Sequence, residues 1–265
     1  MGELPQVNRR QVLAGAAAGA LVIGLHLPAR ADAASMAAAP MSEGVFNAWL
    51  RIAADDSVTI IVSQSEMGQG VYTALPMLLA EELECDWSRV RIAAAAPDDA
   101  YKNLYAVKDA LTGSHADELT GVKDWLVTRL ARVLGEQFTG GSSSVRGGYV
   151  SLRQAGAGAR EMLRAAAAAA WDVPVGECSA ENGRILHAKS GRSSSYGKLA
   201  AAAARLDPPG DLPLKRKERW RLLGKPVARL DMAAKVTGQA QFGIDVRLPH
   251  RRFAAVQASP VFGGK

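Results

Sequence analysis

The sequence is poor in residues that hold metal ions. Among 265 residues there are two cysteines, Cys85 and Cys178, and four histidines. The cysteines form no CxxC pair and the histidines show no ligand spacing, so the sequence indicates no zinc or iron–sulfur site held by this chain. Aromatic residues make up only 6% of the chain.

The sequence also lacks a long hydrophobic run and the common nucleotide-binding loops. A weakly apolar stretch at residues 12–27 has about 16 residues and is rich in alanine and glycine. Roughly 20 apolar residues are needed to span a bilayer. An uncleaved membrane anchor is therefore disfavoured. Neither a GxGxxG loop nor a Walker A sequence is present.

What the N-terminus does contain is a paired arginine before that apolar stretch. Arg9 and Arg10 precede Val12-Leu13, which is typical of a twin-arginine export signal, and residues 29–33 offer small-residue cleavage sites. The alternative is the charged end of a Sec signal. We expect residues 1–33 to be a twin-arginine signal peptide and the protein to be periplasmic. This route carries folded proteins, often because a cofactor is inserted in the cytoplasm. A protein that folds in the reducing cytoplasm need not form a disulfide, so we also expect Cys85 and Cys178 to be free thiols.

The charge balance is basic, with a formal net charge of +6. Much of the excess lies between Lys215 and Arg229, where Glu218 is the single acidic residue. No nucleic-acid motif accompanies it, and an exported protein rarely meets nucleic acid, so we interpret this segment as a solvated connector. At 48% hydrophobic and 22% charged residues, the composition is that of a globular protein of one large or two modest domains.

Periodicity predicts mixed helices and strands. A flexible tether over residues 34–44 precedes a hairpin of two strands around the turn at Ala54–Asp56, and a helix and a strand follow. Further on, a proline-rich linker around Asp207–Pro213 is the clearest domain boundary. The predicted strands are 48–52, 57–62, 90–94, 184–187, 239–246 and 252–258, and the predicted helices are 72–83, 117–134, 145–171 and 196–205.

Two glycine-containing loops each lead into a predicted helix. Residues 66–70 read Glu-Met-Gly-Gln-Gly and residues 139–144 read Thr-Gly-Gly-Ser-Ser-Ser. Glycines allow a backbone to approach a ligand closely, and the free N–H groups at a helix start favour an anion. The alternatives are a plain turn for the first loop and a serine N-cap for the second.

Together these loops carry a family resemblance. The order EMGQG, then TGGSSSV, then LRQAGAGAR at residues 152–160 resembles the molybdopterin-binding large subunits of the xanthine dehydrogenase family. Within it, the chain looks most like the isoquinoline 1-oxidoreductase beta subunits and periplasmic aldehyde dehydrogenases. Lys225-Pro226 and the pattern from Asp231 to Pro249 resemble the start of the α/β hammerhead domain of that family.

The resemblance implies a fold of the α+β class and a domain plan. Residues 45–205 would form the first part of a molybdopterin-binding domain, residues 206–221 a linker, and residues 222–265 the start of a truncated hammerhead domain. The stretch from Lys102 to Gln137 fits the family least well and is interpreted as an insertion.

The resemblance also implies a function. These enzymes are molybdenum hydroxylases that oxidise aldehydes or N-heterocycles with oxygen from water. Their cofactor is molybdenum on molybdopterin cytosine dinucleotide, and electrons leave through an iron–sulfur small subunit, often to a cytochrome. The membrane would be met only during export. The residues implied in cofactor binding are Met67, Gly68, Gln69, Gly70, Thr139, Gly140, Gly141, Ser142 and Ser143.

No catalytic residue is assigned, because the general-base glutamate of the family is expected beyond Lys265. Phe262-Gly263-Gly264 resembles a Phe-Gly-Gly at the active site of the family. Here it follows a predicted strand directly, which is the wrong place, so we interpret it as a turn that matches by coincidence. We expect the polypeptide to be cut short and the chain alone to be inactive. Two rival hypotheses remain: a non-catalytic exported binding module that keeps part of the fold, and a basic protein that binds acidic surfaces through residues 215–229.

Overall fold

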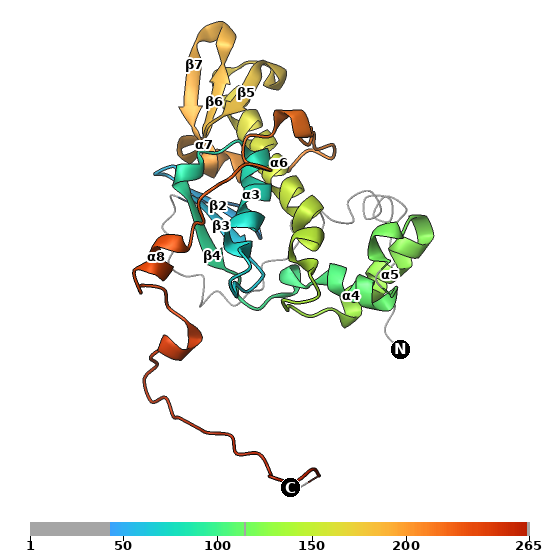
Figure 1. The fold of residues 1–265 in the computed structure, drawn as a ribbon. Coiled ribbons are helices and arrows are strands. Elements are labelled where there is room, and N and C mark those ends of the chain that lie inside the picture. The colour runs from blue at the N-terminus through green and yellow to red at the C-terminus, as the bar shows by residue number, and fades with distance from the viewer. Residues whose placement is uncertain (1–42, 114, 264–265) are drawn as a thin grey trace, which may run out of the picture. The chain divides into compact units, whose positions relative to one another are not determined.

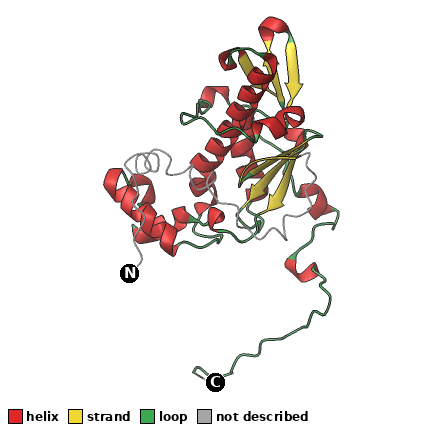
Figure 2. Cartoon of the chain, turned by 180° about the vertical axis from the view of Figure 1, so that it is seen from behind, coloured by secondary structure: helices red, strands yellow, loops and turns green. Residues whose placement is uncertain are grey.

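The computed structural model describes residues 43–113 and 115–263, and the predicted signal peptide lies outside them. The chain divides into two units, one ending at Leu230 and the other beginning at Asp231. Among the described residues, every helix is too short or too polar to cross a membrane. The first unit mixes helices with two small sheets (Figure 2), which agrees with the predicted mixture of helix and strand.

The first sheet has the order β1-β2-β3-β4. Strands β2 and β3 pair antiparallel, which confirms the predicted hairpin. Strands β3 and β4 pair parallel, and a parallel pair needs a crossover, which helix α3 provides. The bounds are β1 Glu43–Asn47, β2 Leu50–Ala53, β3 Val58–Val62, α3 Val71–Leu83 and β4 Val90–Ala94.

Helix α6, Ser143–Trp171, packs along α3 (Figure 1). The contact is very close at Gly156, where an added Cβ would lie 2.2 Å from the carbonyl oxygen of Leu79. Residues meet in sequence order, because Gly148 lies against Leu75 while Arg160 reaches the carbonyl oxygen of Glu82. The two helices therefore run in the same direction, and their N-termini lie at the same end.

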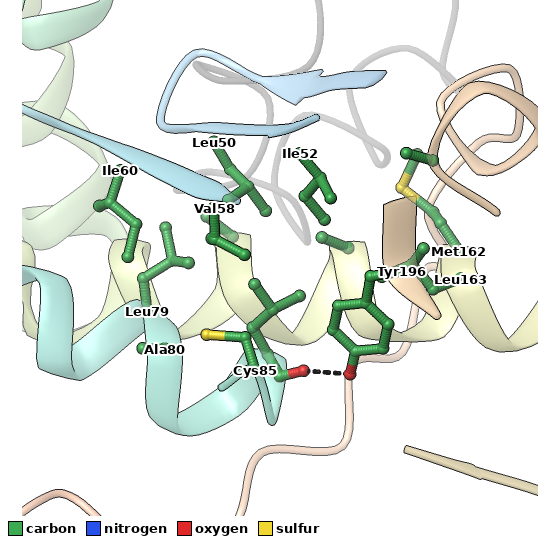
Figure 3. Close-up of a cluster of buried hydrophobic side chains, with 14 of the residues drawn as sticks. Leu50, Ile52, Val58, Ile60, Leu79, Ala80, Cys85, Met162, Leu163 and Tyr196 are labelled. Atoms are coloured by element: carbon green, nitrogen blue, oxygen red, sulfur yellow. Dashed lines mark hydrogen bonds between the residues drawn. The ribbon is translucent and has the colours of Figure 1, made fainter. Parts of the chain in front are cut away.

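The core lies between the first sheet and these helices, as Figure 3 shows for Leu50, Ile60, Leu79 and Leu163. Tyr196 is fully buried, and its hydroxyl donates a 2.6 Å hydrogen bond to the carbonyl oxygen of Leu83. In α3 the apolar residues that predicted the helix, Leu75, Leu78, Leu79 and Leu83, thus mark its core-facing side. The apolar residues that predicted the helix at 117–134 do not, since Val122, Leu126 and Val133 are exposed.

Both cysteines are buried and unpaired, as expected. Burial raises the pKa of the Cys85 thiol to about 12, so this sulfur stays protonated at neutral pH.

The second sheet has the order β5-β6-β7 and is followed by α7. The sequence predicted β6 and α7. It missed β5 and β7 because their residues, Cys-Ser-Ala-Glu and Arg-Ser-Ser-Ser, show no apolar alternation. The bounds are β5 Cys178–Glu181, β6 Arg184–His187, β7 Arg192–Ser195 and α7 Tyr196–Ala203.

The region between β4 and α6 forms two helices, α4 (Leu104–Leu111) and α5 (Gly121–Leu134). The prediction extended one helix from residue 117. It was too long because residues 116–118 form a separate 3₁₀ turn and Leu119 and Thr120 have extended backbones.

A pair of buried acidic residues ends α3. Glu81 and Glu82 are 1% and 0% exposed. The Glu82 carboxylate accepts hydrogen bonds from Nε and Nη2 of Arg153 on α6, at 2.8 and 2.6 Å, and from the backbone N–H of Lys215 at 2.9 Å. Buried carboxylates need such partners, since an unpaired buried charge is very costly.

Glu81 binds the basic segment directly. Its carboxylate accepts hydrogen bonds from the backbone N–H groups of Arg221, Leu222 and Leu223, at 2.9, 2.6 and 3.1 Å, and from the ammonium of Lys215. Burial raises the pKa of the Glu81 carboxyl, but the hydrogen bonds from Lys215 and these amides outweigh burial, and the pKa lies below its usual 4.5.

The basic segment therefore differs from the solvated connector that its composition predicted. Residues 215–223 are fixed to α3 through an acidic pair that looks, in the sequence, like ordinary surface charge. The division into units falls after Leu230, beyond the predicted linker at 206–221.

The second unit differs most from its prediction. The strands expected at 239–246 and 252–258 are absent from the described part of this unit, which instead contains α8 (Met232–Val236) and a 3₁₀ turn at Gly243–Asp245. Its apolar side chains are exposed, with Phe253 at 83% and Val256 at 98%. A strand needs a neighbour to satisfy its backbone groups, and the described residues of this unit supply none. The structure thus gives no support to the predicted hammerhead.

We predict opposite effects for two glycines of α6. Gly156→Ala should lower the free energy of unfolding by about 1–3 kcal/mol, because its Cβ collides with the α3 backbone. Gly158→Ala should be neutral or stabilising by about 0.5–1 kcal/mol, because its Cβ would meet nothing closer than 3.7 Å. Urea unfolding measures both, and equal effects would contradict the close helix packing.

We also predict a pH dependence from Glu81. Its folded pKa lies below the usual 4.5, so its contribution is complete above that pH and is lost as the pH falls through the folded pKa. Glu81→Gln should cost about 3–5 kcal/mol at pH 7. The difference in stability between the native chain and this variant should shrink below pH 4.5. Exposed Glu118→Gln is the control, and a constant difference would refute this account.

Candidate functional site

The two glycine loops lie side by side at the common end of α3 and α6. We name residues 65–70 loop 1 and residues 139–144 loop 2. The backbone N–H of Ser65 donates a 2.8 Å hydrogen bond to Oγ1 of Thr139. A longer bond, 3.4 Å, joins the Ser144 hydroxyl to Gln64 just before loop 1. Loops 74 residues apart in sequence thus meet, as the anion-binding hypothesis requires.

Loop 1 needs glycine for its backbone shape. Gly68 and Gly70 have φ angles of 108° and 88°, which side chains of L-residues rarely tolerate. An added Cβ at either glycine would meet no atom within 4 Å. The glycines therefore shape an exposed loop, on which Met67 is 70% exposed.

The start of α3 holds an anion that belongs to the chain itself. Oε1 of Glu66 accepts hydrogen bonds from the N–H groups of Gly68 and Gly70, at 2.8 and 3.1 Å, and Oε2 accepts one from Tyr72 at 3.1 Å. Arg229 Nη2 lies 3.0 Å from the same Oε1. The expectation that these amides receive an outside anion is corrected: the Glu66 carboxylate occupies that position.

Gln69 is hydrogen-bonded within loop 1. Its Oε1 accepts from the N–H of Met67 at 2.6 Å, and its Nε2 donates to the carbonyl oxygen of Ser65 at 2.8 Å. A carboxamide has two donors and two lone pairs, so one of each remains for a ligand. Gln69 is exposed and keeps the capacity that the family resemblance implied.

In loop 2, the structure removes one of the predicted phosphate contacts. Ser143 is 1% exposed; its hydroxyl donates to the carbonyl oxygen of Gly140 at 2.6 Å and accepts from Asn103 Nδ2 at 2.7 Å. Asn103 also donates to the carbonyl oxygen of Phe138, which fixes the loop. Asn103 was not predicted from the sequence, because it lies in the irregular stretch from Lys102 to Gln137 that was interpreted as an insertion.

The middle of loop 2 is open. Gly141 and Ser142 have φ angles of 62° and 52°, and both residues are exposed. Within the described residues, no hydrogen bond is recorded for the Ser142 hydroxyl or for the N–H of Gly141 or Ser142. These donors stand at the start of the 29-residue helix α6, whose dipole favours negative charge. The α6 start is the one with donors to spare, whereas Glu66 occupies the α3 start.

The residues that the structure describes contain no group of three or more His, Cys, Asp or Glu arranged to hold a metal ion.

Comparison with known proteins gives a family match for part of the chain. The model of a molybdopterin cofactor-binding domain matches residues 9–107, which include loop 1 and stop before loop 2. The beta subunit of isoquinoline 1-oxidoreductase from Brevundimonas diminuta is 35% identical, over 82% of this chain and 29% of that protein. The membrane-bound aldehyde dehydrogenase [pyrroloquinoline-quinone] of Gluconacetobacter polyoxogenes is 27% identical, over 82% of this chain and 24% of that protein.

Among solved structures, quinoline 2-oxidoreductase from Pseudomonas putida 86 matches with a TM-score of 0.37 and 18% identity, over 58% of this chain and 15% of that one. The chain thus spans less than a third of the length of the curated relatives it matches.

We predict that the contact between the loops depends on the Thr139 hydroxyl. Thr139→Val leaves the Ser65 N–H without its acceptor and should make this amide exchange about tenfold faster, since such a bond contributes about 0.5–1.5 kcal/mol. Thr139→Ser keeps the hydroxyl and should exchange like the native chain. Hydrogen exchange by NMR measures both, and unchanged exchange in the valine variant would show that the loops are held together otherwise.

Proposed function

Since its relatives and the matched segment identify this chain as part of a molybdopterin-binding subunit of the xanthine dehydrogenase family, we propose that it helps to hold the molybdenum cofactor of an oxidoreductase. The observation that carries the proposal is the Ser65–Thr139 hydrogen bond, which joins the two glycine loops at one end of two parallel helices. One surface thereby offers contacts from both loops to a single ligand.

The open groups fit the cofactor by their chemistry. Phosphate oxygens need donors, and Gly141 and Ser142 offer two N–H groups and a hydroxyl at a helix start. Gln69 offers one donor and one acceptor to a pterin-like ring, and exposed Met67 offers an apolar contact. Gly68 and Gly70 shape loop 1, while Thr139, Ser143 and the carbonyl group of Gly140 support the loops through hydrogen bonds.

The proposed reaction is that of molybdenum hydroxylases. In the complete enzyme, the bound cofactor supplies the oxidation of an aldehyde or N-heterocycle, with water as the source of oxygen. The residues of this chain bind and orient the cofactor. We assign none of them to proton transfer, because Glu66 is engaged by the α3 amides and Arg229. By itself the chain would be inactive.

The setting of the enzyme is also proposed. The name "subunit beta" of one relative supports assembly with further subunits. We propose an iron–sulfur small subunit, a cytochrome acceptor, the cytosine dinucleotide form of the cofactor, and export to the periplasm by the twin-arginine route. The rival hypothesis of a non-catalytic binding module draws no support from the relatives, whose names are those of oxidoreductases.

One relative names a different cofactor, pyrroloquinoline quinone, so the test must distinguish the two. The complete enzyme should be purified and analysed for molybdenum, pterin and quinone. We predict that Ser142→Glu lowers molybdenum and pterin content at least about tenfold, because a carboxylate beside the phosphate position repels it.

Thr120→Glu is the matched control, since it places the same charge at the start of α5, and it should leave the content unchanged. Full loading of the Ser142→Glu enzyme, or quinone in place of molybdenum, would overturn the proposal.

A further inference from the structure

Glu66 and Arg229 both bind the backbone of loop 1, Glu66 through N–H groups and Arg229 through a carbonyl group. The Glu66 side chain is 5% exposed and takes up the N–H groups of Gly68, Gly70 and Tyr72. Arg229 Nη1 donates to the carbonyl oxygen of Gly68 at 3.1 Å. Three N–H groups and one carbonyl group at loop 1 and the start of α3 are thus bound by these two side chains, and Met67 and Gln69 are left at the surface.

The same arginine ties loop 1 to the basic segment. Arg229 lies 161 residues after Gly68, and next to it the Leu230 N–H donates a 3.0 Å hydrogen bond to Oγ1 of Thr73 on α3. The acidic pair fixes this segment at residues 215–223, and Arg229 fixes it again at the opposite end of α3. A turn can be held by hydrogen bonds between neighbouring residues, so the contact of Arg229 with Gly68 is not needed to form the turn itself.

We infer that Glu66 and Arg229 are positioning residues that preset loop 1 for the cofactor before the cofactor arrives. The inference rests on the proposed function. Its physical basis is preorganisation: a loop already held in its binding shape loses less conformational entropy when the ligand binds. The Glu66 carboxylate supplies the negative charge that the α3 start favours, so the cofactor phosphates are left to loop 2.

The first test is made on the full chain without cofactor. Glu66→Gly removes the carboxylate and should make the amides of Gly68, Gly70 and Tyr72 exchange at least about tenfold faster, since bonds to charged groups are worth about 1.5–3 kcal/mol. Acetate at high concentration should refill the vacated position and restore slow exchange, while leaving the native chain unchanged.

Glu66→Gln is the conservative variant and should be intermediate, with exposed Glu118→Gln as its matched control. The amide of Leu79 in the core reports whether each variant is folded. Unchanged exchange at Tyr72 in a folded variant, or no effect of acetate, would overturn the inference.

The second test uses the complete enzyme. Glu66→Gln and Arg229→Gln should both lower molybdenum and pterin content severalfold, and in both the loop 1 amides should exchange faster. Faster exchange with full cofactor loading would show that the contacts of Glu66 and Arg229 with loop 1 do not serve cofactor binding, and would refute the inference. The proposed function fails separately, through Ser142→Glu, because that variant leaves the contacts of Glu66 and Arg229 intact.

Discussion

Helices α3 and α6 run parallel and pack closely against each other, and the long-range contacts of the first unit are built around this pair. Gly156 allows the backbones to touch, and the buried Glu82 is bound by Arg153 and Arg160 from the facing helix. Glu81 and Glu82, at the same end of α3, also accept hydrogen bonds from backbone N–H groups of residues 215–223. One helix thereby organises the sheet crossover, the long helix and the basic segment.

Parallel packing has a direct consequence for function. Two helix starts lie at the same end, and the loops that precede them meet through Ser65 and Thr139. The chain treats the two starts differently. The Glu66 carboxylate occupies the first and leaves Met67 and Gln69 exposed, whereas the second keeps the donors of Gly141 and Ser142 open. The two loops therefore differ: Glu66 holds the backbone of loop 1, whereas loop 2 keeps open donors, and the proposed contact with the cofactor phosphates rests on these donors.

Local patterns predicted most of the first unit but not its long-range contacts. Apolar periodicity located the hairpin, α3 and most of α6, because these elements bury one face. It missed β5 and β7, whose residues are polar. It also missed α4 and β1, and the first residues of β1, 43 and 44, had been assigned to the flexible tether. In the second unit it proposed strands where the described residues offer no pairing partner. The two loops were found from their glycines. The roles of Glu66, Glu81 and Asn103 were missed, since each depends on atoms that only the folded chain brings near.

The most direct test of this account is an experimental structure of the complete, cofactor-loaded enzyme. We expect the pterin beside Met67 and Gln69, with phosphate oxygens within hydrogen-bonding distance of the Gly141 and Ser142 amides. The Glu66 carboxylate should still accept hydrogen bonds from the amides of Gly68, Gly70 and Tyr72. A cofactor bound away from loops 1 and 2, or a phosphate in place of the Glu66 carboxylate, would contradict it.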